Sequence, residues 1–268
     1  MASDDDVMTL DSIINNPDFD FLTHYLSTVP TDDNDLSNII SPYSNIDMCC
    51  KYFDETEFVN EFKLKNEQLF LSLNVQSLPA KFNELEDFIT YLKNNRCEPD
   101  FICLQETWKI IDQSLFNIEG YNLEIKSRSK NTQGGGVGIY IKKGFRYRIL
   151  QESSIFIDKV FESIFIEVFD ESSKYIVGSI YRPNSVHPNL TSNEQMNQFM
   201  ELFSNQVDHF SSLNSTVYIL GDFNIDLLKY HESDFVQNYA DMFFSSGFLQ
   251  LIMKPTRCTS NTASLIAV

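Results

Sequence analysis

Asp222 and Asn224 form the pair whose residue types and spacing most directly suggest chemistry in this 268-residue chain. They follow residues 217–220, which are apolar or β-favouring and predict a buried strand, and Gly221 allows the backbone to turn there. Side chains two residues apart in an extended chain point the same way, so a carboxylate and a carboxamide would lie together at the strand end. Enzymes built from strands and helices commonly place their chemistry at such ends. The alternative is an ordinary polar turn, because Gly, Asp and Asn are frequent turn residues.

Three more predicted strands end in polar residues. Asn74 ends an apolar run that starts at residue 69, Glu106 follows residues 101–104, and Tyr181 ends residues 175–181. Each has an ordinary explanation by itself, as a turn former, a solvated acid or a packed ring with a wet hydroxyl. Because the four strand ends occur together, we expect them to form one site.

These side chains suit phosphodiester hydrolysis. Magnesium prefers oxygen ligands and is often held by one or two carboxylates, so Glu106 could anchor it. Asp222 could then align or deprotonate a water molecule for in-line attack. Asn74, Asn224 and the Tyr181 hydroxyl would donate hydrogen bonds to the phosphate as charge develops on it.

The elements that must position these residues alternate along the chain. Apolar spacing predicts helices over residues 78–93, 195–213 and 235–244, and a last strand candidate over residues 248–252. The glycine run at residues 134–136 lacks the lysine and spacing of a P-loop, so close backbone packing or a mobile hairpin is the better interpretation. The derived fold class is α/β, with a mixed sheet or two packed sheets.

The net charge of −18 is unevenly distributed. Residues 1–65 hold fourteen acidic residues and three lysines without sustained periodicity, so we expect an acidic, largely disordered leader before a domain over residues 66–268. The domain is only mildly acidic. Bases cluster within residues 126–148 and provide a candidate nucleic-acid surface, with a solvated hairpin as the alternative.

Cysteine spacing and the chain start bear on localisation. The five cysteines show neither disulfide-framework nor zinc-ligand spacing, which fits free thiols in a reducing compartment. The first residues lack the pattern of a secretory signal, and no apolar run is long enough to cross a bilayer. We therefore expect an intracellular protein, nuclear or cytoplasmic, with no membrane partner; the oligomeric state stays open.

Six short motifs, in order, carry a resemblance to a known family. They are Leu-Asn-Val-Gln-Ser-Leu at residues 73–78, Leu-Gln-Glu-Thr-Trp at 104–108, Gly-Gly-Gly-Val at 134–137, Ile-Tyr-Arg-Pro-Asn at 180–184, Gly-Asp-Phe-Asn at 221–224 and Pro-Thr-Arg at 255–257. Together, over roughly residues 67–266, the chain resembles the endonuclease/exonuclease/phosphatase superfamily. Within it, the motifs are most similar to the apurinic-type endonuclease domain of non-LTR (LINE-type) retrotransposon polyproteins.

The resemblance implies a four-layer α/β sandwich of two packed mixed β-sheets flanked by helices. It also implies Mg²⁺ or Mn²⁺ as cofactor and target DNA as the partner that is nicked. By motif, the metal-ligand glutamate is Glu106, and the catalytic residues are Asn74, Tyr181, Asp222 and Asn224. Weaker candidates for contact with nucleic acid share a positive charge; they are Lys126, Arg128, Lys130 and Arg182.

The end of the chain departs from the family pattern. In the family, an Asp and a later Ser-Asp-His motif follow Ser-Leu-Ile, whereas here the corresponding position is Ala267 and Val268 is last. We therefore expect a C-terminally truncated domain that lacks its last strand or strands, with impaired DNA-nicking activity. The alternatives are an inactive retrotransposon remnant or binding module on the same fold, and a soluble phosphatase acting on lipid or nucleotide phosphates.

Overall fold

The computed structural model describes residues 50–63, 67–128, 134–170, 173–185, 187–258 and 263–266. Most of the expected leader lies outside this part, so its disorder and its boundary stay predictions. Its described end contains helix α3 (Glu55–Phe62), which begins with a capping box in which Asp54 and Glu57 bond to each other's backbone N–H. Phe58, Val59 and Phe62 of this helix pack against the apolar cluster of the first sheet.

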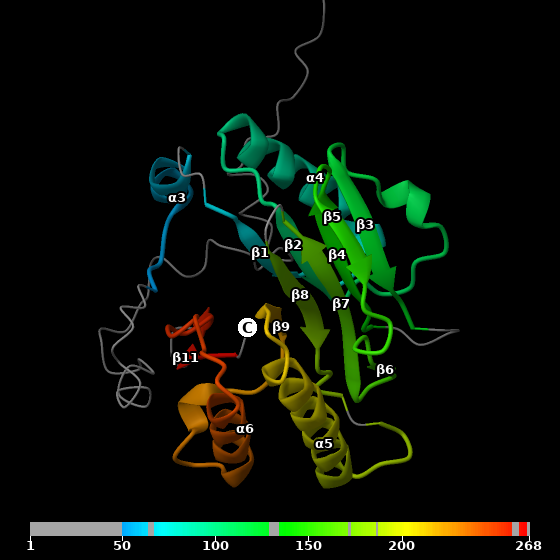
Figure 1. The fold of residues 1–268 in the computed structure, drawn as a ribbon, viewed down its shortest axis with the longest axis vertical. Helices are drawn as coiled ribbons and strands as arrows, with labels where there is room; N and C mark the ends of the chain where they lie inside the picture. Colours follow the sequence, from blue (N-terminus) through cyan, green and yellow to red (C-terminus); the bar gives the residue numbers. More distant parts are fainter. Residues whose placement is uncertain are drawn as a thin grey trace, which may run out of the picture.

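Two mixed β-sheets lie face to face and carry helices on their outer sides, which confirms the expected fold class (Figure 1). In the first sheet the order is β1-β2-β4-β3, and in the second β5-β7-β8-β9, with β6 paired to β7. The bounds are β1 Phe70–Asn74, β2 Phe101–Gln105, β3 Tyr121–Lys126, β4 Val137–Lys142, β5 Arg146–Ile149, β6 Phe156–Ile157, β7 Phe161–Phe169, β8 Lys174–Tyr181 and β9 Thr216–Asp222. Strands β1 and β2 are parallel, as are β8 and β9, and the other pairs within the two sheets are antiparallel.

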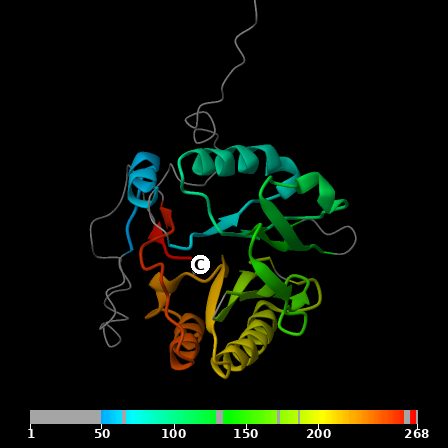
Figure 2. The same cartoon turned by 45° about the horizontal axis from the view of Figure 1, so that its top comes forward.

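The helices follow from the apolar spacing noted in the sequence. Helix α4 (Leu78–Asn94) covers the outer face of the first sheet, and α5 (Ser192–Ser211) and α6 (Asp234–Ser245) cover that of the second (Figure 2). Short 3-10 turns are η3 (Gln113–Phe116) and η4 (Leu227–Lys229). No helix of the described residues is long and apolar enough to span a membrane.

The alternation of side chains along β2 explains why both faces of its sheet are covered. Phe101 and Cys103 pack between the sheets, whereas Ile102 and Leu104 pack against the cluster that contains α4. All five residues of β2 are buried, as the uninterrupted apolar run in the sequence predicts.

The side chains in the layer between the sheets change from aromatic to polar along the strands. At one end it is aromatic: the ring of Phe70 lies 5.2 Å from that of Phe101 and 4.7 Å from that of Tyr218. At the other end a buried polar bond joins the sheets, from Gln105 Nε2 to Ser179 Oγ at 3.1 Å. The apolar end therefore holds the sheets together, and the polar end leads to the strand ends expected to form the site.

The prediction of a last strand over residues 248–252 is wrong. This segment has no regular structure, although its apolar pattern is that of a strand. Its side chains serve other contacts: Phe248 packs against the cluster of α5 and α6, and Gln250 donates to the carbonyl of Ile252 at 3.0 Å. The short pair β10 (Arg257–Cys258) and β11 (Ala263–Ser264) follows instead.

Phe203 provides a test of the helical side of the core. Its side chain is fully buried among Phe161, Phe199, Phe223 and other rings, so Phe203→Ala should lower the free energy of unfolding by about 3–5 kcal/mol. Urea denaturation measures this change. The control Leu115→Ala, at a side chain that is 67% exposed, should change it by less than about 0.5 kcal/mol. Equal effects of the two substitutions would contradict the assigned core.

Candidate active site

The side-chain amide of Asn74 joins the two sheets at the carboxyl ends of their parallel strands. Its nitrogen donates to Glu106 Oε1 at 2.8 Å and to Asp222 Oδ2 at 2.8 Å. Glu106 follows β2 in the first sheet, and Asp222 ends β9 in the second. The structure thus brings together three expected site residues from strands that are far apart in sequence.

Backbone hydrogen bonds continue beyond the strand ends and fix the turns that carry these residues. In the first sheet, Val75 N–H donates to Gln105 O at 2.9 Å and Ser77 N–H donates to Glu106 O at 2.8 Å. In the second, Arg182 N–H donates to Asp222 O at 2.9 Å. Within each sheet the two turns are therefore joined through their backbones, and the Asn74 side chain links the two pairs into one rim.

Several residues of this rim adopt left-handed backbone conformations that are unfavourable for side chains other than glycine. The φ angle is 53° at Glu106 and 49° at Asn224, and it is also positive at Gln76, Ser77 and Trp108. Such strain commonly collects where a side chain must be aimed at a ligand. At Glu106 this conformation accompanies a carboxylate bonded to Asn74, whereas asparagine, as at position 224, tolerates the left-handed region.

Asn224 and Tyr181 complete the cluster. Asn224 N–H donates to Asp222 Oδ1 at 3.0 Å, and its side-chain amide donates to Arg182 O at 2.8 Å. The Tyr181 hydroxyl is hydrogen-bonded to Glu106. Burial, followed by the charge of Glu106, raises the pKa of Tyr181, so the hydroxyl keeps its proton and can donate it in a hydrogen bond.

Asp222 lies in a less polar environment than an ordinary surface carboxylate. Burial raises the pKa of Asp222, hydrogen bonds from Asn74 and Asn224 oppose the rise, and the charge of Glu106 adds to it. A carboxylate with a raised pKa accepts a proton more readily near neutral pH.

The expected nucleic-acid contacts do not match the positions of two arginines. The Arg182 guanidinium lies between the rings of Phe199 and Phe235 and donates to the carbonyls of Phe223 and Asn224 at 3.1 Å. Arg128 is also buried, with a side chain that is 3% exposed. Both charges are engaged inside the protein, so we assign these arginines to the framework of the turns instead.

Part of the rest of the basic cluster is engaged as well, whereas Lys143 and Arg146 are exposed. Lys126 Nζ donates to Ser154 O at 2.8 Å, Lys142 forms ion pairs with Glu98 and Asp100, and Arg148 pairs with Glu167. Lys130 lies outside the described residues. The sequence showed the charges but could not show that acids on neighbouring segments would pair with them.

The glycine run packs against the turn that carries Glu106. Gly135 O accepts from Trp108 N–H at 2.7 Å, and Gly136 O accepts from Thr107 N–H at 3.3 Å. A Cβ atom on Gly136 would lie 2.4 Å from Thr107 Oγ1, and φ is +89° there, so only glycine fits without displacement. Of the two interpretations from the sequence, close backbone packing is the one that the structure shows.

Two charged residues near the site were missed in the sequence. Arg257 is exposed on β10, and its charge lowers the pKa of Asp222; its motif was noted, but no role was assigned to it. Glu162 is fully buried next to the glycine run. The sequence signal for Glu162 was an acidic residue within the otherwise apolar strand predicted at residues 161–168.

The donor set fits a hard divalent cation. Within the described residues there is no group of three or more His, Cys, Asp or Glu side chains that could hold a metal by themselves. Glu106 and Asp222 nevertheless face the same amide nitrogen with like charges, and both are partly accessible to solvent. Oxygen donors of this kind suit Mg²⁺, which usually takes only one or two carboxylates and retains water molecules.

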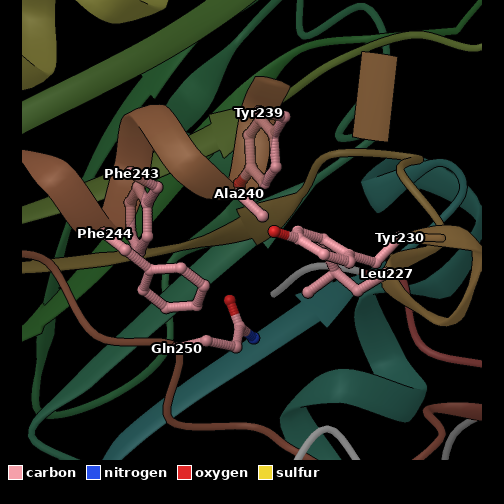
Figure 3. A pocket seen from close by; sticks show the side chains of 7 residues that line it. All are labelled: Leu227, Tyr230, Tyr239, Ala240, Phe243, Phe244 and Gln250. Atoms are coloured by element: carbon pink, nitrogen blue, oxygen red, sulfur yellow. The ribbon is translucent and has the colours of Figure 1, made fainter. Parts of the chain in front are cut away.

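A small pocket lies elsewhere in the fold. It is lined by residues of η4 and α6 and by Gln250, and it encloses about 10 Å³ between aromatic rings (Figure 3). That volume accommodates roughly one water molecule. None of its lining residues belongs to the polar cluster, so it is not a candidate for the chemistry.

A family model gives independent evidence on this constellation. The description of the model is the endonuclease/exonuclease/phosphatase family, and it matches residues 71–248, which is more than half of the chain. The chain belongs to this family. The match covers Asn74, Glu106, Tyr181, Asp222 and Asn224.

Solved structures of this family have similar folds. The AP endonuclease LMAP of Leishmania major is 14% identical, with a TM-score of 0.53 over 74% of this chain and 76% of that one. The endonuclease domain of TRAS1, a telomere-specific non-LTR retrotransposon, is 9% identical, with a TM-score of 0.49 over 74% and 81%. The Neisseria 3′ phosphatase NExo, bound to a product DNA hairpin, is 17% identical, with a TM-score of 0.48 over 69% and 73%. No curated protein sequence matches the chain. At 14% identity, the likeness to LMAP concerns the fold alone.

The raised pKa of Asp222 predicts that this site costs stability at neutral pH. The folded protein holds the Asp222 proton more tightly than the unfolded chain does, so the stability it contributes is present below about pH 3.9 and is lost as pH rises through the folded pKa. Asp222→Asn stays uncharged, so its stability relative to the wild type should be higher at pH 8 than near pH 4. Urea denaturation at both pH values measures this difference. Glu201→Gln, at an exposed position of α5, is the control substitution; a stability difference between Asp222→Asn and the wild type that is the same at both pH values would contradict the assignment.

Proposed function

We propose that the chain is a metal-dependent phosphodiesterase that nicks DNA, of the type found in non-LTR retrotransposons. The observation that carries the proposal is the Asn74 amide held between Glu106 and Asp222, with Tyr181 and Asn224 bonded to the same cluster. Membership of the family supports phosphodiester hydrolysis as the reaction class.

Each residue has a role that its surroundings support. Asp222, whose pKa burial raises, accepts a proton from the attacking water. Asn224 and Asn74 orient its carboxylate, since one donates to Oδ1 and the other to Oδ2. The Tyr181 hydroxyl keeps its proton and donates a hydrogen bond toward a phosphoryl oxygen as negative charge develops there.

Glu106 is the proposed ligand of Mg²⁺ or Mn²⁺. When bound, such an ion polarises a phosphoryl oxygen and offsets the charge that develops on the leaving oxygen. The mutual repulsion of Glu106 and Asp222, which contributes to the raised pKa of Asp222, would be relieved by a cation. Asn74 keeps the Glu106 carboxylate facing this position.

DNA is the proposed substrate, and the ordered motif set supports it. The similarity to an AP endonuclease is consistent with that choice, although at 14% identity it speaks only for the fold. The site is partly open at Asn74, Glu106, Asp222 and Asn224, as a polymeric substrate requires.

We further propose that the activity is weak, because the described residues give the cluster no histidine partner. His209 lies in the last turn of α5, which leads into the start of β9, at the opposite end from Asp222. His187 and His231 have contacts within their own segments, with Asn189 and with the ring of Tyr230. A missing member of a cooperative catalytic set costs about a thousandfold in rate or more.

A plasmid-nicking assay tests the proposal. With Mg²⁺ and protein in excess over supercoiled DNA, the wild type should form relaxed circles slowly, and EDTA should abolish the reaction. Glu106→Gln removes the ligand charge and Asp222→Asn removes the base, so each should lower the rate about a hundredfold or more. Glu201→Gln, exposed on α5, should nick at the wild-type rate.

The alternatives give different outcomes. Equal nicking by the wild type and both site variants would reject the assigned residues. Retarded migration of the plasmid without relaxed product would identify an inactive binding module on the same fold. Strong inhibition by an excess of a small phosphate monoester would favour a phosphatase over a DNA endonuclease.

A further inference from the structure

Glu162 is a carboxylate with no exposed surface on strand β7. Its two oxygens have different partners. Oε2 accepts the Gly136 N–H at 2.6 Å, whereas Oε1 accepts from Arg128 Nε at 2.6 Å and from the Lys159 N–H at 3.4 Å. Burying such a pair costs desolvation that apolar residues of the same volume would avoid.

The hydrogen bond from Gly136 connects Glu162 to the turn that carries Glu106. Gly136 accepts from Thr107 through its carbonyl, and Gly135 accepts from Trp108. The side chain of Arg128 also lies against the glycine run, because a Cβ atom on Gly135 would be 2.1 Å from Arg128 Nε. Glu162 and Arg128 thus contact the glycine run on one side. On its other side the run accepts hydrogen bonds from Thr107 and Trp108, the residues directly after Glu106.

Glu162 also lies next to a second member of the cluster. In the antiparallel pairing of β7 and β8, Glu162 is directly opposite Tyr181. Side chains at directly opposed positions share one face of a sheet, and here that face is turned toward the first sheet. The charge of Glu162 contributes to the raised pKa of Tyr181.

We propose that Glu162 is a positioning residue for the divalent-cation site at Glu106: it anchors the glycine run, which fixes the left-handed turn at Glu106. The proposal rests on the proposed function, because that function assigns the cation to Glu106. Partners that orient a metal ligand from behind typically account for ten- to hundredfold in metal affinity.

The same strand provides a matched control. Glu167 is also buried on β7 and pairs with Arg148 at 2.6 Å and Lys174 at 2.8 Å. It lies five residues further along the strand, or roughly 17 Å at the usual rise. The ion pairs of Glu167 are with residues of β5 and β8 and not with the glycine run.

The experiment compares two charge-neutral replacements of the buried pair in the full chain. Arg128→Met with Glu162→Gln retains an oxygen that can accept the Gly136 N–H, whereas Arg128→Met with Glu162→Leu removes it. Both remove one positive and one negative charge, so their long-range electrostatics are equal. Thermal unfolding identifies the temperature range in which both are folded.

Mn²⁺ binding, followed by loss of the free-ion electron paramagnetic resonance signal, is the first measurement. The Leu double variant should bind about ten- to hundredfold more weakly than wild type, and the Gln double variant within about threefold of it. Arg148→Met with Glu167→Leu should leave the affinity unchanged. Equal affinity of the Leu and Gln double variants would overturn the proposal.

Amide hydrogen exchange without metal is the second measurement. The Thr107 and Trp108 amides should exchange at least tenfold faster in the Leu double variant than in the Gln double variant, and unchanged protection would also overturn the proposal. This measurement separates the two levels of inference. Failure of the wild type to bind Mn²⁺ would contradict the proposed function, while the exchange rates would still decide whether Glu162 positions the turn.

Discussion

The side-chain amide nitrogen of Asn74 lies between the carboxylates of Glu106 and Asp222 and donates to both. Without this nitrogen, the two like charges would face each other directly across the boundary between the sheets. Each sheet can form its own hydrogen-bond ladder without the other. The relative position of Glu106 and Asp222, however, exists only when the two sheets are packed together. The packing of the two sheets therefore sets the geometry of the site, including the positions of the turns with positive φ angles on both sides.

The inner layer explains how a polar cluster is tolerated at the end of an apolar core. Side chains become progressively more polar toward the site, from the rings at Phe70 and Tyr218 to Gln105 and Ser179. The buried side chains of Gln105 and Ser179 are paired with each other across the sheets, which limits the desolvation cost. The carboxylates then lie where solvent still reaches them, so their charge is retained at lower cost than deep in the core.

Much of the site could be inferred from the sequence because strand ends are recognisable. Apolar runs that stop at Asn74, Glu106 and Tyr181 place those side chains at carboxyl ends, and parallel strands bring carboxyl ends together. The sequence did not distinguish a charged side chain on the surface from one buried inside the protein. Arg182 is adjacent to Tyr181 in sequence, but only the fold shows that two aromatic rings enclose it. The strand prediction for residues 248–252 was wrong for a related reason: an apolar pattern cannot show whether a partner strand is available.

The division of the site between two sheets has a consequence for how the core can vary. Cys103 and Val177 lie in the layer that separates the sheets, so their volumes act as spacers between Glu106 and Asp222. A change of one methylene group there costs about 0.5–3 kcal/mol of stability, and the apolar contacts can re-form after a small shift. The hydrogen bonds of Asn74 tolerate much less displacement. Selection on these interior positions would therefore follow the geometry of the site, although none of their atoms touches a substrate.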